Sequence, residues 1–233
     1  MDKGIKIYIT VISLVTAAAI IVGCFIFITG RLSFGKKMGV AVSNEVAIEG
    51  EITSLEIDMD AVEVRIETGN EPYVSYNVAD TEVPEIKEEN GKLSIISPKG
   101  RNIGFPGVAI HPSLEVVLAE GTDLESLNMK IDAGNVNLDR LKATDAKLKL
   151  DAGNLDIDEL EAQTLSVEVD AGNVDVDESN IGTLQVSVDA GNIDVDDSTV
   201  KQGECKADVG NISLDGDIGD VKVKTDIGKT SVH

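Results

Sequence analysis

The sequence predicts an all-β protein: a single-stranded parallel β-helix, or β-solenoid, with rungs of about 19 residues, preceded by one N-terminal transmembrane helix. Three observations predict this fold class. A tetrapeptide recurs at a constant interval in the C-terminal half, apolar and polar residues alternate around every copy, and one long apolar run near the N-terminus carries no charge.

The apolar run covers residues 7–29, between Lys6 and Arg31, and is dominated by Ile, Val, Ala, Leu and Phe. A helix of this length, rising about 1.5 Å per residue, spans the ~30 Å hydrocarbon core of a bilayer. A buried core helix would show a polar face, and this run has none. We therefore expect a short N-terminal flank at residues 1–6, a transmembrane helix at 7–29 and a juxtamembrane linker at 30–44.

Two alternatives remain for this anchor. A cleaved signal peptide usually has a shorter apolar core, of roughly 7–15 residues, and a small-residue cleavage site that is not found after the run. A lipoprotein anchored at Cys24 would use the small residue Gly23, but Phe25 continues the apolar run where a lipid-attached terminus usually turns polar. Basic residues flank both ends of the run, so their number does not fix the orientation. The signal-like charge order and the repeats behind it favour an extracytoplasmic domain.

The tetrapeptide Asp-Ala-Gly-Asn is the strongest feature of the sequence. Its four identical copies follow one another at intervals of 19 residues; Asp-Val-Gly-Asn continues at the same interval, and Asp-Ile-Gly-Lys comes 18 residues later. The copies begin at Asp132, Asp151, Asp170, Asp189, Asp208 and Asp226. A fixed period of this length is typical of repeat proteins in which each copy contacts its neighbours.

Apolar and polar residues alternate on both sides of each copy. Val167 and Val169 precede one turn, and Val174 and Val176 follow it, with polar residues between them. Such alternation is typical of a strand with one buried face, whereas a helical repeat would need a period of about 3.6 residues. An antiparallel meander would send successive turns to opposite edges of the sheet. The constant interval instead favours coils stacked in parallel, with equivalent residues about 4.8 Å apart.

Each tetrapeptide is expected to form a tight corner between two strands. The Gly falls where a sharp turn needs a positive φ, which Gly adopts freely. The Asn amides of successive rungs would form a ladder of hydrogen bonds along the stack. The predicted structural turn residues are Gly134, Asn135, Gly153, Asn154, Gly172, Asn173, Gly191, Asn192, Gly210 and Asn211.

Before the first copy the pattern is looser. Residues 55–66 show the same strand–turn–strand alternation without the Gly-Asn pair, and Pro and Gly at residues 98–112 indicate a loop. We expect one continuous solenoid over residues 45–233, with degenerate rungs or a cap at 45–125 and regular repeats at 126–233.

These repeats resemble the DAGN-type β-strand repeat family of bacterial membrane-anchored proteins labelled "putative adhesin", also called toast-rack domains. The resemblance is carried by the Asp-Ala-Gly-Asn copies, the segment Leu114–Leu127 that leads into them, and the single N-terminal span, and it covers residues 46–233. It implies a single-stranded β-helix outside the cell membrane, often linked to envelope-stress systems, with no catalytic residues to carry over. The chain lacks the extra helical or second membrane domain of some relatives, so the resemblance implies no particular partner.

Acidic side chains at equivalent positions of the repeats are the candidate functional residues. Stacked outward, like charges ~4.8 Å apart repel by about 1 kcal/mol per pair even in water. A solvated surface with counter-ions tolerates this repulsion, whereas bridging Ca²⁺ or Mg²⁺, or a docked polycation, would relieve it. The candidate metal ligands are Asp156, Asp158, Asp175, Asp177, Asp194 and Asp196. No other cofactor is expected.

Composition excludes several classes of function. The formal net charge of −22 leaves no basic face for nucleic acid. His111 and His233 are too few for a histidine-based site, and Cys205 falls in an apolar column that predicts a buried thiol. Some β-helix enzymes process polysaccharides with grouped carboxylates. Here, however, the carboxylates recur uniformly and aromatic residues make up only 3% of the chain, so no sugar platform accompanies them.

We therefore expect a non-catalytic binding or scaffold module of the bacterial cell envelope, attached to the membrane through residues 7–29. Its expected partner is an envelope protein, a basic peptide or a glycan. An adhesin or a surface spacer stabilised by divalent cations is one alternative, and a polysaccharide-processing enzyme is the other.

Overall fold

The structure is a computed structural model that describes residues 40–98 and 111–233. The predicted transmembrane helix and Cys24 lie outside these residues. Within them every regular element is a strand, and no helix is long and apolar enough to cross a membrane.

The strands are β1 (Ala41–Ala47), β2 (Ser54–Ala61), β3 (Glu63–Gly69), β4 (Tyr73–Ala79), β5 (Glu85–Glu89), β6 (Lys92–Ile96), β7 (Ser113–Ala119), β8 (Leu124–Ala133), β9 (Val136–Asp139), β10 (Lys142–Ala152), β11 (Leu155–Asp158), β12 (Glu161–Ala171), β13 (Val174–Asp177), β14 (Asn180–Ala190), β15 (Ile193–Val209), β16 (Ile212–Ile227) and β17 (Thr230–Val232).

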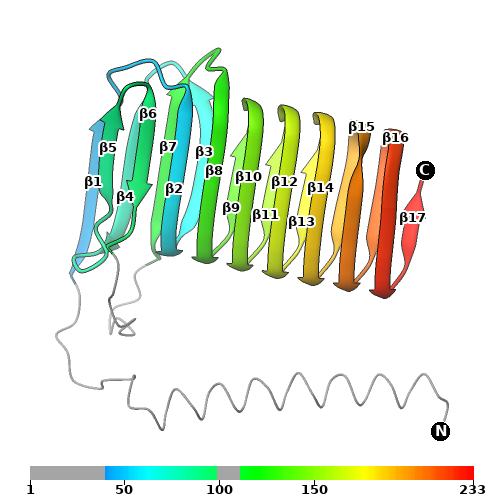
Figure 1. The fold of residues 1–233 in the computed structure, drawn as a ribbon. Helices are drawn as coiled ribbons and strands as arrows, with labels where there is room; N and C mark the ends of the chain where they lie inside the picture. Colours follow the sequence, from blue (N-terminus) through cyan, green and yellow to red (C-terminus); the bar gives the residue numbers. More distant parts are fainter. Residues whose placement is uncertain (1–39, 99–110) are drawn as a thin grey trace, which may run out of the picture. The chain divides into compact units, whose positions relative to one another are not determined.

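Each regular rung consists of a long strand, the Asp-Ala-Gly-Asn corner, a short strand and a return corner that leads into the next long strand. The long strands β8, β10, β12 and β14 pair with one another in parallel, and so do the short strands β9, β11 and β13. β15 and β16 run through the return corner and contribute to both rows. Figure 1 shows the long strands side by side with the short strands behind them. We call these two rows the long-strand sheet and the short-strand sheet.

The register follows the sequence repeat. Leu148 pairs with Val167, and Val167 with Val186, so residues 19 positions apart are neighbours in the sheet. The predicted all-β solenoid with a spacing of about 19 residues is confirmed.

The N-terminal part departs from this regular winding. β2 and β3 form the first rung and pair in parallel with β8 and β9, although residues 70–123 separate β3 from β8 in the sequence. This inserted segment extends both sheets beyond the first rung. β7 pairs with β3 in parallel, β4 pairs with β7 and β1 in antiparallel fashion, and β5 and β6 form an antiparallel pair beside β2.

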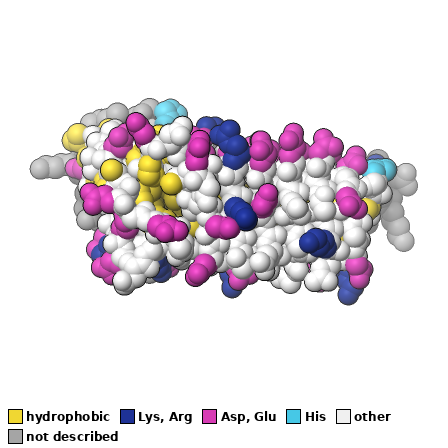
Figure 2. Space-filling view, turned by 90° about the horizontal axis from the view of Figure 1, so that it is seen from above, with side chains coloured by type: hydrophobic (Ala, Val, Ile, Leu, Met, Phe, Trp, Pro, Cys, Tyr) yellow, Lys and Arg dark blue, Asp and Glu magenta, His cyan; other side chains and the backbone are white. Residues whose placement is uncertain are grey.

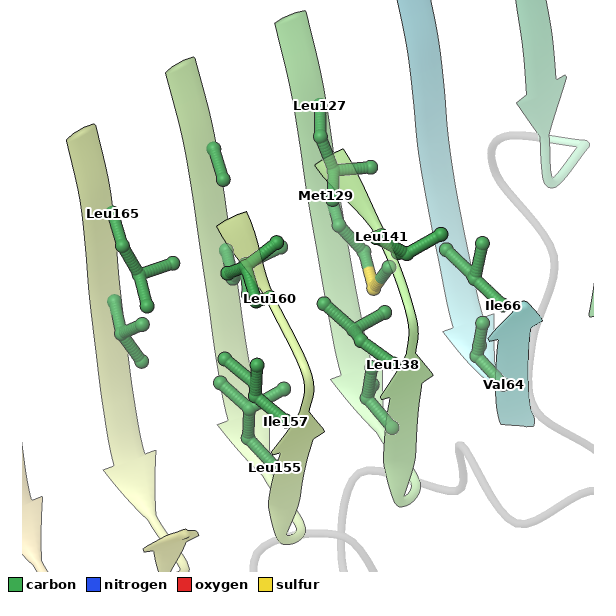
Figure 3. Packing of buried hydrophobic residues seen from close by; sticks show 14 of the residues in the cluster. Val64, Ile66, Leu127, Met129, Leu138, Leu141, Leu155, Ile157, Leu160 and Leu165 are labelled. Carbon is green, nitrogen blue, oxygen red and sulfur yellow. The ribbon is translucent and has the colours of Figure 1, made fainter. Parts of the chain in front are cut away.

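The core lies between the two sheets, because the inward residues of both point into one continuous apolar interior. Leu127 and Leu165 from the long strands meet Leu138, Leu155 and Ile157 from the short strands, as Figure 3 shows, and all five are fully buried. Burial of a side chain of this size stabilises the fold by about 1.5–3 kcal/mol. Repetition of the same contacts in each rung therefore supplies the main stabilising free energy.

Cys205 occupies one of these inward positions, opposite Val186 in the neighbouring strand, and is fully buried. Its burial, and to a lesser degree Glu204, raise the pKa of the thiol to about 12. A thiol with this pKa stays protonated at neutral pH and is a weak nucleophile.

Candidate functional site

The Asp-Ala-Gly-Asn corners are fixed by backbone geometry. Gly134 and Gly153 have φ near 140°, and Gly172, Gly191 and Gly210 have φ of 154° or 155°. In this range of φ a side chain is strongly disfavoured. The stack adds a second constraint, since a Cβ on Gly172 would lie 1.6 Å from the carbonyl oxygen of Gly153 in the rung before. Only glycine allows consecutive corners to approach this closely.

The corner asparagines form a ladder along the stack. The Asn173 side-chain oxygen accepts hydrogen bonds from the backbone N–H of Asn192, at 3.0 Å, and from its side-chain amide, at 3.2 Å. The same pair of bonds joins Asn135 to Asn154, Asn154 to Asn173, and Asn192 to Asn211. Each asparagine therefore satisfies a backbone donor of the following rung, which is a structural role.

The outward side chains of the short-strand sheet form two carboxylate columns. Asp156, Asp175 and Asp194 are in register, and all three are exposed. The second column contains Asp139, Asp158, Asp177 and Asp196. No lysine or arginine occurs in β9, β11, β13 or residues 193–196 of β15. We call this surface the acidic face.

Basic side chains of the same rungs lie mainly on the long strands. Lys130 contacts Asp132 at 2.9 Å, Lys206 contacts Asp208 at 2.6 Å, and Lys149 pairs with Glu168 of the next rung. Figure 2, which looks onto the upper ends of the strands in Figure 1, shows carboxylates following one another along one edge of the stack with few basic groups among them. Basic groups therefore lie mainly on the long-strand side, although Arg140 contacts Asp139 at the start of the second column.

The titration of two aspartates reflects this separation. Partial burial, followed by the charges of Asp194 and Asp156, raises the pKa of Asp175. By contrast, the hydrogen bond from Lys206 lowers the pKa of Asp208 on the long-strand side. The charge of Asp175 is thus disfavoured in the folded protein, whereas that of Asp208 is compensated by its neighbour.

Three carboxylates come together at a return corner. Asp139, Asp158 and Glu159 can each offer an oxygen within 4.8 Å of the other two, a grouping that suits an oxygen-liganded cation. Asp139 also contacts Arg140 at 2.9 Å, and this guanidinium would compete with a cation. Of the predicted metal ligands, Asp158 belongs to this group.

The other predicted ligands are distributed along the acidic face. Asp175 and Asp194 lie in the first column with Asp156, and Asp177 and Asp196 continue the second. Sequence analysis did not single out Glu159. The available signal was its position directly after the short strand, where Arg140, Glu178 and Asp197 also occur, and the structure gives all four a positive φ.

A shallow groove of about 640 Å³ runs over the first rungs of the acidic face. Its polar lining includes Arg65, Glu115, Asn137, Asp156 and Asp175. The Tyr73 hydroxyl donates a hydrogen bond to Glu115 at 3.0 Å, beside the groove. Backbone pairing aligns Arg65 with both Glu115 and Asn137, so the groove follows the column from the N-terminal strands into the regular rungs.

Taken together, the architecture is that of a repeat-built β-solenoid that offers repeated outward columns for contact. The Toastrack DUF4097 family matches residues 52–233, and the chain belongs to this family.

Solved structures resemble this chain at low sequence identity. A "putative adhesin" from Bacteroides fragilis is 13% identical, with a TM-score of 0.52, covering 85% of this chain and 98% of its own. A "putative cell adhesion protein" from Clostridium sporogenes is 16% identical with a TM-score of 0.48, covering 83% and 99%. A "putative lipid binding protein" from Parabacteroides distasonis is 17% identical with a TM-score of 0.44, covering 84% and 97%. No curated protein matches the sequence.

Proposed function

We propose that this chain is a membrane-anchored, extracytoplasmic and non-catalytic binding module of the bacterial cell envelope, and that its acidic face docks a cationic partner such as a basic peptide or a basic segment of an envelope protein. The observation that carries the proposal is the separation of charge between the two sheets, which leaves the columns of Asp156 and Asp158 without a basic side chain in their strands.

The physical argument is electrostatic. Parallel pairing sets like charges about 4.8 Å apart along each column, so their potentials add over several rungs. A flexible polycation can follow such a column and bring one charge near each rung. Complementary charge of this kind raises the association rate and selects against acidic partners. Partial burial is the main cause of the raised pKa of Asp175, and the charges of Asp194 and Asp156 add the repulsion that the partner would relieve.

The names of the solved structures agree with a binding role, since they describe adhesins and a lipid-binding protein. The anchoring part of the proposal rests on the apolar residues 7–29, and a part in envelope-stress responses rests on the family resemblance.

Binding is tested with the full chain in detergent micelles and a fluorescent decalysine peptide. Changing Asp156, Asp175 and Asp194 together to Asn should weaken binding at least about tenfold, equivalent to about 1.4 kcal/mol. The matched control changes Asp151, Asp170 and Asp189 to Asn, which removes the same charge from the beginning of the same three corners. Equal weakening by both sets would show attraction to net charge alone and would refute docking on the acidic face.

Anchoring and orientation are tested separately on intact cells expressing the chain. Added protease should remove the residues beyond about 38 and leave a small membrane fragment. Cleavage only after lysis would show a cytoplasmic domain. Incorporation of a labelled fatty acid that is lost in Cys24→Ser would replace the transmembrane anchor with a lipoprotein anchor.

A second candidate function is a surface spacer stabilised by divalent cations. It is favoured by the close approach of Asp139, Asp158 and Glu159 at one return corner. The two functions are distinguished by peptide binding, because a spacer would respond to calcium without binding decalysine at the acidic face.

A further inference from the structure

The two ends of the solenoid differ in how their strands terminate. At the N-terminal end the long-strand sheet finishes with the five-residue β5, which carries Glu85, Lys87, Glu88 and Glu89. Short, charged edge strands of this kind oppose pairing with another chain. At the C-terminal end, residues 216–227 of β16 pair with β15 alone and β17 pairs with β16 alone. The last rung therefore leaves a 12-residue strand edge without a partner among the described residues.

The core also opens at this end. Ile218, Val221 and Val223 of β16 point inward but are only partly buried, whereas Val200 and Cys205 one rung earlier are at most 1% exposed. Beyond them Ile227 is 49% exposed. Apolar surface of this kind gains free energy when another surface removes it from water.

The charge of the last rung is unlike that of the middle ones. Residues 151–169 carry six acidic and no basic residues, and residues 170–188 carry four acidic and none basic. Residues 216–227, which form the free edge, carry three aspartates and two lysines, so their formal charge is only −1. The repulsion that would keep two acidic surfaces apart is therefore weaker where the strand edge is free.

We propose that a second copy of this chain docks on the C-terminal end, with β16 pairing antiparallel to β16 of the copy about a two-fold axis near Thr225. An axis at this residue places Lys224 opposite Asp226 of the other copy, and Val223 opposite Ile227 of the other copy. By symmetry each of these pairings occurs twice. The surface is thus complementary to itself, as a two-fold interface requires.

The order of charges favours this register, which pairs residues 223–227 of each β16, over an axis at Val223. Lysine on an edge strand usually prevents pairing, because like charges then face one another. A two-fold axis at Val223 would indeed set Lys222 against Lys224. Moving the axis to Thr225 replaces this repulsion with two Lys–Asp pairs and covers Ile227, the most exposed apolar residue of β16. Opposite charges across an antiparallel pair contribute roughly 0.2–1 kcal/mol each.

Charge reversal tests the interface, using the full chain in detergent micelles and light scattering to measure the protein mass over a range of concentrations. We expect reversible formation of a two-chain species. Lys224→Asp should weaken it at least about tenfold, because the introduced carboxylate would face Asp226 of the other copy, and this repulsion would occur twice in each pair. Asp226→Lys should do the same by setting two lysines opposite each other.

The chain offers matched controls one rung earlier. Lys206 pairs with Lys224 in the sheet, Asp208 is the next outward residue after it, and the two form the same local ion pair as Lys224 and Asp226. Lys206→Asp and Asp208→Lys should therefore leave association unchanged, because both neighbouring strands are already in place. Mixing the Lys224→Asp and Asp226→Lys chains should restore a two-chain species that neither forms alone.

Four results would overturn the proposal. The first is a single-chain mass at every concentration. The second is an association that Lys224→Asp leaves unchanged, which would place the contact in another part of the chain. The third is failure of the two variants to associate when mixed while circular dichroism shows both folded. The fourth is protection of the β16 amides from hydrogen exchange by an added strand-forming peptide while no two-chain species forms. The β16 edge would then bind a partner other than a second copy of the chain.

Discussion

Substitution of glycines by alanine should separate two effects that act together in the stacked corners. One is the unfavourable backbone conformation, and the other is the overlap of the new Cβ with the neighbouring rung. Gly172 has a φ of 154°, and a Cβ there would lie 1.6 Å from the Gly153 carbonyl oxygen. Gly121 has a positive φ of 78° but nothing within 4 Å of a built Cβ. Gly50 has no positive φ, and its Cβ would meet only the flexible end of Glu88. Gly172 therefore tests a positive φ together with backbone overlap, and Gly121 tests a positive φ alone. Gly50 tests neither effect.

The expected magnitudes follow from this geometry. Gly121→Ala should cost about 1–2 kcal/mol, the penalty for a left-handed backbone conformation with a Cβ. Gly50→Ala should change stability by less than about 0.5 kcal/mol, as most surface changes do. In Gly172→Ala the new Cβ also overlaps the Gly153 backbone, and no side-chain rotamer relieves this overlap. The rung that contains Gly172 must therefore move away from the rung that contains Gly153. That movement breaks the Gly153 N–H bond to the Ala171 carbonyl, and we expect a cost above about 4 kcal/mol.

Urea unfolding followed by circular dichroism measures these differences, and hydrogen exchange locates them. Repeat proteins are stabilised by contacts between neighbouring rungs, so the damage from Gly172→Ala should appear as faster exchange in β11 to β14. Gly219 is unsuitable as a neutral comparison, since a Cβ there would overlap the Lys201 carbonyl oxygen. If Gly172→Ala and Gly121→Ala destabilise equally, close stacking of the corners is not what requires glycine.

Three further predictions concern the ladder and the acidic face. Asn173→Ala should cost about 1–3 kcal/mol in urea unfolding because the Asn192 N–H loses its acceptor, whereas Asn137→Ala removes only a side-chain bond and should cost less than about 0.5 kcal/mol. At matched ionic strength, calcium should raise the melting temperature more than sodium, and changing Asp158 to Asn together with Glu159 to Gln should abolish the difference. Identical melting curves in calcium and sodium would show that these carboxylates are only solvated. The raised pKa of Asp175 means that its contribution to stability falls as pH rises from the ordinary value of 3.8 through the raised one, so Asp175→Asn should stabilise the fold at pH 7 and match the wild type below that window. A stabilisation that persists in acid would contradict this assignment.

The regular rungs could be predicted from sequence because one residue pattern repeats with one geometry. Apolar positions such as Val167 and Val186 fall in register simply by adding the repeat length, and parallel stacking follows from that constancy. The order of the N-terminal strands could not be predicted in this way. β8 pairs with β2 although β3 to β7 lie between them in the sequence, and alternation within a strand does not specify which strand it pairs with.

The outward aspartate columns of the site could be predicted from the sequence, whereas the arrangement of side chains at the return corners could not. Alternation of apolar and polar residues predicted that Asp175 points outward. The approach of Glu159 to Asp158, however, depends on a positive φ of 52° at Glu159, and a positive φ cannot be predicted from a residue that is not glycine. Ser179 is another corner residue whose role could not be predicted, because the equivalent positions in the earlier rungs are leucine. Its buried hydroxyl accepts a hydrogen bond from the Leu160 N–H and donates to the Asp177 carbonyl, which closes the return corner with polar contacts.

Repulsion between the carboxylates of the acidic face lowers the stability of the fold, so a reason other than stability is needed for their presence. Each neighbouring pair in the columns costs about 0.9 kcal/mol at the dielectric constant of water and a separation of about 4.8 Å. The charges of Asp194 and Asp156 add to partial burial in raising the pKa of Asp175. The same outward positions accept other residues, since Asn137 and Ser213 stand in register with Asp156 and Asp194. The long-strand sheet moreover shows that lysine can be placed beside carboxylates in this stack, as Lys149 is beside Glu168. The run of Asp156, Asp175 and Asp194 in one column therefore supports the proposal that this sheet binds positive charge.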